Sequence, residues 1–351
     1  MTILIVYIFL WDFYPYKILR LKEDGIRDYT PNIDLYKYKV ITHVHTQFSF
    51  DSLGKPSDIK KAMEDNNIDF VFVTDHNNDD YKYFEDERIF AGVELNTEDG
   101  RLLKLGNKLP VISHPNNFEF EHYRWKGEFK EGHLYELIDI KDMVVWSKLK
   151  TGMKLLKNIF LYPFTRDIIR KWNALIPLEK WVKLYFERAS HLKIIGGSDI
   201  HIKFVYQEHT HGILIPSYKS GFKWITNYVI TKEELKNKEE VLKALEKGRS
   251  LLVLNQKFGT VFIEKDNNLY NLGDVVPIHS KINVSFPQKK LVKILKKDNK
   301  PILITQNRNF GFTLKEEGKY HLEVYEYDFK LGSLYFGFRP VAVSNLVEVR
   351  S

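Results

Sequence analysis

Eight histidine and acidic residues stand in short motifs at or near the ends of apolar runs. They are His43, His45, Asp51, His76, Glu94, His114, Asp199 and His201. Imidazole nitrogens and carboxylate oxygens are the side-chain ligands that suit zinc, manganese and iron. The types and spacing of these residues therefore predict a metal site built from nitrogen and oxygen donors.

The positions of these residues in their runs favour one shared site. His43 and His45 form an HxH pair, so a strand would place both imidazoles on one face. Five predicted strands each carry an ionisable group at or near the C-terminal end, the edge where active sites of parallel α/β folds form. Burying so many groups together without a cation would leave polar atoms unpaired and carboxylates in repulsion. A multinuclear metal site would remove both costs.

Alternating strands and helices must position these groups. Apolar runs predict strands over residues 39–45, 69–75, 89–97, 109–113, 135–140 and 192–196. Pro56 and Ser57 begin a predicted helix that ends at Asn66 and carries Ile59, Ala62 and Met63 as its apolar stripe. This β-α-β alternation predicts a parallel sheet that is curved or closed into a barrel.

The remainder of the chain divides into further segments. Residues 118–190 interrupt the alternation and are interpreted as a helical insertion. From residue 216, a predicted helix over 232–247 ends at Gly248, and short strands with Gly and Asn turns predict a small antiparallel β-sandwich. The lysine-rich run 289–297 is interpreted as a solvated face. The predicted division is 1–37 as a linker, 38–215 as the α/β domain and 216–351 as the β-rich domain.

The composition excludes several classes of protein. The 351 residues include 53 Lys and Arg against 46 Asp and Glu, which gives a net charge of +7. With 28% charged and 44% hydrophobic residues, the chain is typical of a globular protein and not of disorder, collagen or coiled coil. Its length suggests two or three domains. The absence of cysteine excludes disulfides, thiolate zinc sites, iron–sulfur clusters and cysteine nucleophiles, whereas histidine occurs 12 times.

The N-terminus carries a separate apolar run, ILIVYIFLW, over residues 3–11. Nine residues are too few to span a bilayer, which takes about 20. The run is similar to the apolar part of a signal peptide, yet no Lys or Arg precedes it and no cleavage site follows. A buried strand and a membrane or export role both stay open, and with them the location of the protein.

Five motifs in order resemble the PHP domain, named for polymerase and histidinol phosphatase. They are ITHVHTQFSFDS, FVTDHN, GVELN, ISHPNN and GGSDIH, within residues 38–205. The resemblance implies a distorted, TIM-like β/α barrel of seven strands, two to three divalent metal ions (zinc, manganese or iron) and hydrolysis of phosphoesters. Near the C-terminus, ALEKGRSLLV, GKYHLEVYEY and RPVAVSNLVEV resemble the carbaryl-hydrolase-like branch, in which a β-sandwich follows the barrel.

The resemblance also implies a role for each motif residue. The first metal would be held by His43, His45, Glu94 and Asp199. Glu94 would bridge to a second metal beside His114, and the third metal would be held by Asp51, His76 and His201. Glu136 and Asp139 would flank the pocket without being ligands.

One position departs from the family pattern. Relatives often have a histidine after the glycine that here is Gly100, but this chain has Arg101. Arginine cannot bind a metal and carries a fixed positive charge. Either Arg101 replaces the second cation and clamps a substrate phosphate, or the metal site is degenerate. A surface arginine in a slightly shifted alignment is the third interpretation.

The leading functional hypothesis is a phosphoesterase that uses metal-bound hydroxide on a small-molecule or nucleotide phosphoester. Asp199 or His201 would also move a proton, and Arg101 would bind the developing negative charge. The alternatives are a hydrolase of carboxylic esters, amides or carbamates, and a non-catalytic binding protein with a degenerate site. The net charge supports nucleic-acid binding only weakly. A second HxH pair, His209 and His211, is interpreted as part of a loop.

Overall fold

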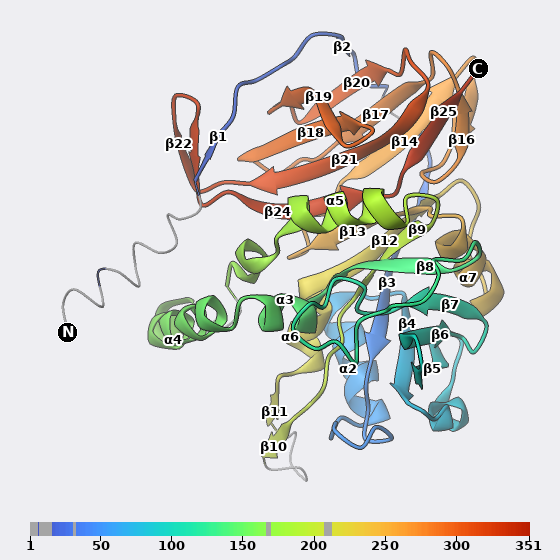
Figure 1. The fold of residues 1–351 in the computed structure, drawn as a ribbon, viewed down its shortest axis with the longest axis vertical. Helices are drawn as coiled ribbons and strands as arrows, with labels where there is room; N and C mark the ends of the chain where they lie inside the picture. Colours follow the sequence, from blue (N-terminus) through green and yellow to red (C-terminus); the bar gives the residue numbers. More distant parts are fainter. Residues whose placement is uncertain (1–5, 7–15, 31–32, 166–169, 207–212) are drawn as a thin grey trace.

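The computed structural model describes residues 6, 16–30, 33–165, 170–206 and 213–351. An α/β region forms the lower part of the molecule in Figure 1, and a β-rich region lies above it. Apart from Val6, the N-terminal apolar run lies outside the described residues, as do His209 and His211. Within the described ranges, no helix is both long and apolar enough to cross a membrane.

Seven strands of the α/β region pair with one another in chain order. They are β3 (Tyr36–Val44), β4 (Phe70–His76), β5 (Ile89–Thr97), β6 (Gly100–Leu105), β7 (Leu109–Ile112), β8 (Leu134–Asp139) and β9 (Lys193–Gly197). The pairs β3–β4, β4–β5, β7–β8 and β8–β9 are parallel, whereas β6 is antiparallel to both neighbours. The protein is thus a mixed α/β protein with a mostly parallel central sheet.

Strand β6 is the one strand of this set that the sequence patterns do not predict. Only two residues separate it from β5, which is too short for a parallel crossover and therefore makes a hairpin. Gly100 begins the strand with φ +123°, and a Cβ there would lie 2.6 Å from the backbone oxygen of Arg124. Arg101, the next residue, thereby enters the sheet opposite Asn96.

The other predicted elements of this region lie close to their expected positions. All seven residues of β4 are buried, as expected for a near-continuous apolar strand in a sheet covered on both faces. Helix α2 (Pro56–Asn66) has the predicted bounds and buries the predicted stripe of Ile59, Ala62 and Met63. These short-range predictions are confirmed.

The first and last strands of the set approach each other at their C-terminal ends. The amide of Ser198 donates to the carbonyl of Thr42 at 3.1 Å, and the amide of His45 donates to the carbonyl of Ile200 at 3.1 Å. A single parallel bridge joins Val44 to Ile200. This contact brings the two edges together locally, and closure into a seven-stranded barrel stays a prediction.

Helices α3 (Ile140–Trp146), α4 (Lys148–Thr165) and α5 (Leu178–Arg188) lie in the predicted insertion, with a 3₁₀ turn at Trp172–Leu175. Another 3₁₀ turn, Asp80–Phe84, lies outside the insertion, between β4 and β5. The insertion is not helical throughout, because β8 lies within it and residues 118–133, all described, form no helix. Figure 1 shows α4 projecting away from the body of the molecule.

The C-terminal half continues the central sheet. Strand β12 (Ile225–Thr231) pairs with β3, and β13 (Ser250–Leu254) joins it to β24 (Arg339–Ser344), β21 (Gly318–Glu326) and β25 (Val347–Arg350). Helices α6 (Tyr218–Trp224) and α7 (Lys238–Glu246) connect this part. Residues on both sides of the predicted domain boundary at 215 therefore share one sheet, and the boundary itself stays a prediction.

A second sheet completes the β-rich region. It orders β15 (Asn268–Tyr270), β14 (Thr260–Lys265), β17 (Lys281–Ser285), β20 (Asn309–Thr313) and β2 (Ile26–Arg27). The remaining strands are β1 (Lys17–Ile18), β10 (Phe204–Tyr206), β11 (Ile213–Ile215), β16 (Val275–Pro277), β18 (Leu291–Lys297), β19 (Lys300–Thr305), β22 (Phe329–Leu331) and β23 (Leu334–Phe336). Of these, β18 pairs with β21 and β19 in the central sheet. Apolar side chains from both sheets, such as Val284 and Leu322, share one core.

One prediction for this half is wrong, and another is wrong only at the start of a helix. The predicted helix over 232–247 begins only after Asn237, whose side chain accepts a hydrogen bond from the amide of Glu240 and so fixes the start. The lysine-rich run 289–297 is not a solvated face, because most of it is β18, in which Lys293 and Lys296 are buried. Both faces of the strand are covered, because Leu291 and Leu295 pack into one apolar cluster and Val292 and Ile294 into another, and the two buried lysines lie among them.

Candidate metal centre

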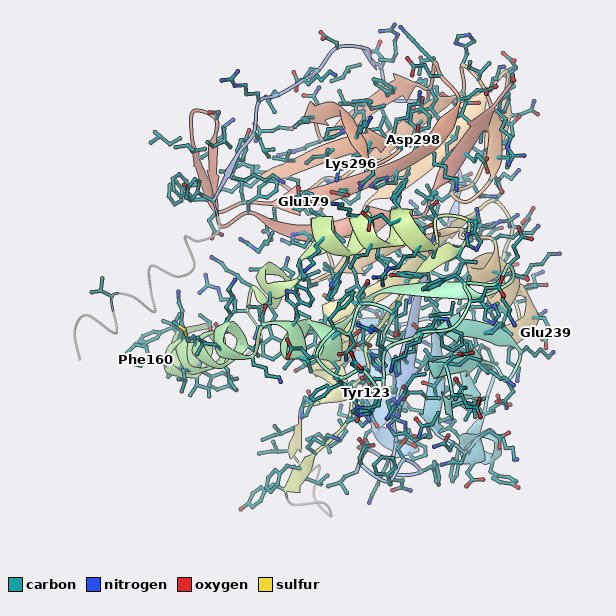
Figure 2. The ribbon with its side chains drawn as sticks, viewed as in Figure 1. Tyr123, Phe160, Glu179, Glu239, Lys296 and Asp298 are labelled. Atoms are coloured by element: carbon teal, nitrogen blue, oxygen red, sulfur yellow. The ribbon has the colours of Figure 1, made fainter. Side chains whose placement is uncertain are left out.

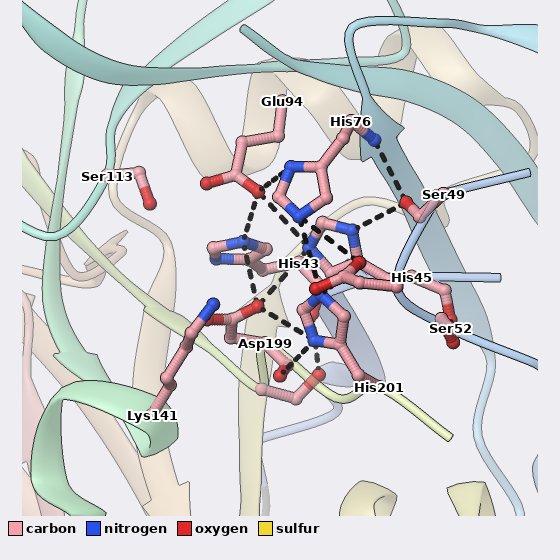
Figure 3. Close-up of polar contacts among 12 residues, drawn as sticks. His43, His45, Ser49, Ser52, His76, Glu94, Ser113, Lys141, Asp199 and His201 are labelled. Atoms are coloured by element: carbon pink, nitrogen blue, oxygen red, sulfur yellow. Dashed lines mark hydrogen bonds and ion pairs between the residues drawn. The ribbon is translucent and has the colours of Figure 1, made fainter. Parts of the chain in front are cut away.

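The eight predicted ligands lie at or after the C-terminal ends of the parallel strands, and Figure 3 labels six of them, His43, His45, His76, Glu94, Asp199 and His201. His43, His76 and Glu94 lie in β3, β4 and β5, while the others follow a strand directly or in the next loop. Seven of the eight are buried, and the side chain of Asp51 is 26% exposed. The structure thus brings together every residue that the motifs single out.

The backbone is strained at three of these residues. His43, His114 and Asp199 have φ angles of +59°, +51° and +39°, in the left-handed region that side chains disfavour. Such conformations cost about 1–3 kcal/mol each and cluster at functional sites. At His43 the strain coincides with a register shift between β3 and β4, so this strand does not alternate regularly around the HxH pair.

The first group of donors surrounds one point between the strands. It consists of His43, His45, Glu94 and Asp199, whose ligand atoms all lie within 4.8 Å of one another. The Nε2 atoms of His43 and His45 lie 3.5 and 3.3 Å from Oε2 of Glu94. The same two atoms lie 3.5 and 3.3 Å from Oδ1 of Asp199.

A second group adjoins the first and shares His45 with it. Its other histidines are His76 and His201, with 3.4 Å between their Nε2 atoms. Oδ1 of Asp51 lies 3.5 Å from Nε2 of His76 and 3.2 Å from Nε2 of His201. The motif residues assigned to a third metal by resemblance are thus neighbours.

Most of the donor atoms in these groups lack a hydrogen bond. Among the described residues, the buried atoms of this kind include Nε2 of His43, His45 and His114, Oδ1 of Asp51, and both carboxylate oxygens of Glu94 and Asp199. Leaving buried polar atoms unpaired costs about 1–3 kcal/mol each, and more for charged groups. Divalent ions would bind these atoms, so the residues fit metal ions.

In three of the motif histidines, the Nδ1 atom lies within hydrogen-bond distance of a supporting side chain. Nδ1 of His43 lies 2.8 Å from Oε1 of Glu136, and Nδ1 of His114 lies 3.0 Å from Oδ1 of Asp142. Partners of this kind fix the ring orientation and leave Nε2 for a metal. Glu136 therefore has the flanking position that the sequence predicts.

Ser49 holds the third ring. Nδ1 of His45 lies 3.0 Å from its Oγ, and the hydroxyl of Ser49 in turn donates to Asp75 at 2.8 Å. Asp75 also accepts hydrogen bonds from the amide and hydroxyl of Thr46. This chain of hydrogen bonds fixes the conformation of the loop that follows β3. No sequence pattern predicts the role of Ser49.

Asp139 forms a third group of possible ligands with His43 and His114, whose ligand atoms also lie within 4.8 Å of one another. Its carboxylate lies near the Nδ1 atoms of His43 and His114, at 3.5 and 3.7 Å, but these atoms already have Glu136 and Asp142 as closer partners. Burial and the neighbouring charge of Glu136 raise the pKa of Asp139 well above its usual value. A neutral Asp139 fits a flanking role.

The electrostatic field of the centre is strongly negative. Burial opposes charge on Glu94, but His43 holds the pKa of this carboxyl well below its usual value. Burial likewise opposes charge on Asp199, whose pKa is held well below its usual value by Lys141 and then by His43. Burial also opposes charge on His43, yet Glu136, Asp199 and Glu94 raise its pKa well above the ordinary value. A bound cation would take over the stabilisation of these carboxylates that His43 and Lys141 provide.

Two cationic side chains line the side of the centre nearest His114. Nη1 of Arg101 lies 2.9 Å from Oε1 of Glu94 and 3.1 Å from Nδ1 of His76. Its side chain is only 7% exposed, so the interpretation as a surface arginine is wrong. Lys141, at the start of α3, places Nζ 3.3 Å from Oδ2 of Asp199. Sequence reasoning missed Lys141 and Asp142, whose signal was their position directly after a predicted strand.

Comparisons with known proteins give little further information. No protein-family model matches the sequence, and no curated protein matches it. Among solved structures, a two-domain protein from Bacteroides vulgatus, which contains a predicted PHP-like metal-dependent phosphoesterase, is 14% identical to this chain. The match covers 92% of this chain and 100% of that one, with a TM-score of 0.33, so the likeness is distant.

Proposed function

We propose that this protein is a metal-dependent phosphoesterase. The observation that carries the proposal is the convergence of unpaired, buried donor atoms in two adjacent groups that share His45. Divalent ions bound there would lower the pKa of coordinated water to about 7 and stabilise negative charge on a phosphoryl oxygen. The sequence motifs that resemble the PHP domain support the same assignment, including a distorted seven-stranded barrel.

The residues of the chain have distinct tasks in this proposal. His43, His45, Glu94 and Asp199 would hold one ion, and His76, His201 and Asp51 would hold another. The side chain of Asp51 is 26% exposed and its Oδ1 lies 3.2 Å from Nε2 of His201, so Asp51 connects this second group to solvent. Zinc, manganese and iron all suit these donors.

The charges around the centre favour an anionic substrate. Arg101 and Lys141 lie on one side of the metal groups, and the Arg101 guanidinium has donors beyond the one that contacts Glu94. A phosphoryl group of a small molecule or a nucleotide would approach ions and cations together. The assignment to the carbaryl-hydrolase-like branch depends on the C-terminal motifs alone. Nucleic-acid binding and membrane association through the N-terminal run remain predictions.

A substrate screen tests the proposal. The purified protein, loaded with Mn²⁺ or Zn²⁺, is assayed with p-nitrophenyl phosphate, bis-p-nitrophenyl phosphate and aryl carboxylic esters. We expect hydrolysis of a phosphoester that is lost in Glu94→Gln. Turnover of carboxylic esters alone would favour the hydrolase of esters, amides or carbamates. Bound metal without any turnover would favour a binding protein.

A further inference from the structure

The two central carboxylates each face metal ligands with one oxygen and a protein cation with the other. Oε2 of Glu94 faces His43 and His45, while its Oε1 lies 2.9 Å from Nη1 of Arg101. Oδ1 of Asp199 faces the same histidines, while its Oδ2 lies 3.3 Å from Nζ of Lys141. The centre is therefore asymmetric in how its negative charge is balanced.

His114 lies on the side that the two cations occupy. Its Nε2 is 3.4 Å from Oε1 of Glu94 and 3.7 Å from Oδ2 of Asp199, the two oxygens that Arg101 and Lys141 contact. A metal ion that shares Glu94 and Asp199 with the first group would need these same atoms on this side. It would then stand close to two fixed positive charges, and a guanidinium cannot relieve the repulsion by losing its proton. The other donor group here contains Asp139, but the Nδ1 atoms of its two histidines already have Glu136 and Asp142 as partners.

The fold holds both cations in place. Arg101 lies in β6, and its guanidinium carbon is 4.2 Å from the centre of the Tyr123 ring. Lys141 lies in the first turn of α3, and its Nζ is 5.4 Å from the centre of the same ring. Tyr123, labelled in Figure 2, thus contacts both cations. The amide of Arg101 also donates to the carbonyl of Tyr123 at 3.3 Å.

We propose that Arg101 and Lys141 take the place of the second metal ion that the resemblance implies beside His114, so that the centre holds two divalent ions per chain. This inference assumes the metal centre of the proposed function. The two ions occupy the groups around His43 and His201, and His114 is a neighbour of both carboxylates without being a metal ligand. The side nearest His114 then presents organic cations to the substrate.

The metal content of variants tests this inference without measuring turnover. Wild type, His114→Gln, His201→Gln and the double variant Arg101→His/Lys141→Ala are equilibrated with Mn²⁺ or Zn²⁺, freed of excess ion and analysed for metal. We expect two ions per chain in the wild type, two in His114→Gln and one in His201→Gln. The double variant removes both charges and adds an imidazole, so we expect it to bind a third ion.

Several outcomes would overturn the inference. Three ions in the wild type, or the loss of one ion in His114→Gln, would show that a metal binds on the side nearest His114 and would leave the proposed function standing. No metal in the wild type would overturn both. Circular dichroism establishes that each variant is folded, and the metal content of His114→Gln tests the inference even if the double variant does not fold.

Discussion

Two buried clusters of ionisable side chains lie in different halves of the molecule. One is the metal centre, and the other lies in the β-rich half on β18 and β21, where it contains Lys296, His321, Glu323 and Tyr325. Figure 2 labels Lys296 in the upper region and Tyr123, which adjoins the centre, in the lower region. Both clusters bury carboxylates beside histidines and a cation, yet they differ in how the polar atoms are paired.

The β-rich cluster satisfies its own carboxylate. Oε1 of Glu323 accepts hydrogen bonds from Lys296 at 2.7 Å and from His321 at 3.1 Å, and Oε2 accepts one from Tyr325 at 2.7 Å. At the centre, by contrast, both oxygens of Glu94 and of Asp199 lack a hydrogen bond in the described part of the chain. Buried charge alone therefore does not mark a functional site, whereas unpaired donors that converge on one point do.

The largest expected effect is the response of stability to metal ions. Ions that bind only the folded state, at 1,000 times their dissociation constant, would raise the free energy of unfolding by about 4 kcal/mol. Urea unfolding with Mn²⁺ or Zn²⁺ and then with excess chelator measures this difference. His321→Gln, which alters the β-rich cluster, is the control and should keep the full response. An equal free energy of unfolding with ion and with chelator would remove the contrast between the clusters.

Acid should weaken the β-rich cluster through Glu323. Burial opposes its charge, but His321 and Lys296 lower its pKa from 4.5 to about 2. A lowered pKa means that Glu323 stabilises the fold fully above its unfolded-state pKa of 4.5 and loses this contribution as the pH falls to about 2. The total is about 3 kcal/mol, of which roughly 2 kcal/mol is lost by about pH 3.

Unfolding free energies at about pH 6 and about pH 3 test this effect. We expect the wild type to lose about 2 kcal/mol more than Glu323→Gln between these values. Glu316, whose side chain is 71% exposed, provides the matched control, and Glu316→Gln should behave as the wild type. The same loss in wild type and Glu323→Gln would contradict the view that hydrogen bonds and ion pairs stabilise the charged Glu323 carboxylate in the β-rich cluster.

A smaller effect is expected from the layer behind the metal ligands. Glu136→Gln preserves the shape of the side chain but removes the charge opposite Nδ1 of His43. We expect metal affinity to fall by about 10–100-fold, because such partners orient the ligand and raise its basicity. Isothermal titration of the ion measures the change. Glu323→Gln should bind with wild-type affinity, and equal affinities for all three proteins would show that Glu136 has no such role.

The sequence predicts the elements and residues that local patterns encode. Helix α2 has the expected bounds because Pro56 and the apolar stripe define it, and β4 follows from its continuous apolar run. Most of the eight motif residues could be selected because they stand at or near a strand end, where the topology of parallel strands brings distant groups together. The HxH motif at His43 and His45 was the strongest local signal.

Other features depend on contacts that no local pattern contains. Strand β12 pairs with β3 although the two strands lie far apart in the sequence. The sequence therefore does not predict that one sheet continues from the α/β region into the C-terminal half. Lys141 approaches Asp199 only because β8 and β9 are neighbours, which lets the first turn of α3 face the centre. Lysine is usually exposed, but Lys293 in β18 is buried, because its place in the strand puts it on the same buried face as Leu291 and Leu295.

The most direct test of the account is the metal content of three proteins after equilibration with Mn²⁺ or Zn²⁺ and removal of excess ion. The wild type and His321→Gln should each retain divalent ions, because the β-rich cluster takes no part in binding. Asp199→Asn, which removes a charge shared by the first group, should retain fewer ions. A wild type without bound metal, or an Asp199→Asn variant with as much metal as the wild type, would contradict the assignment of this centre.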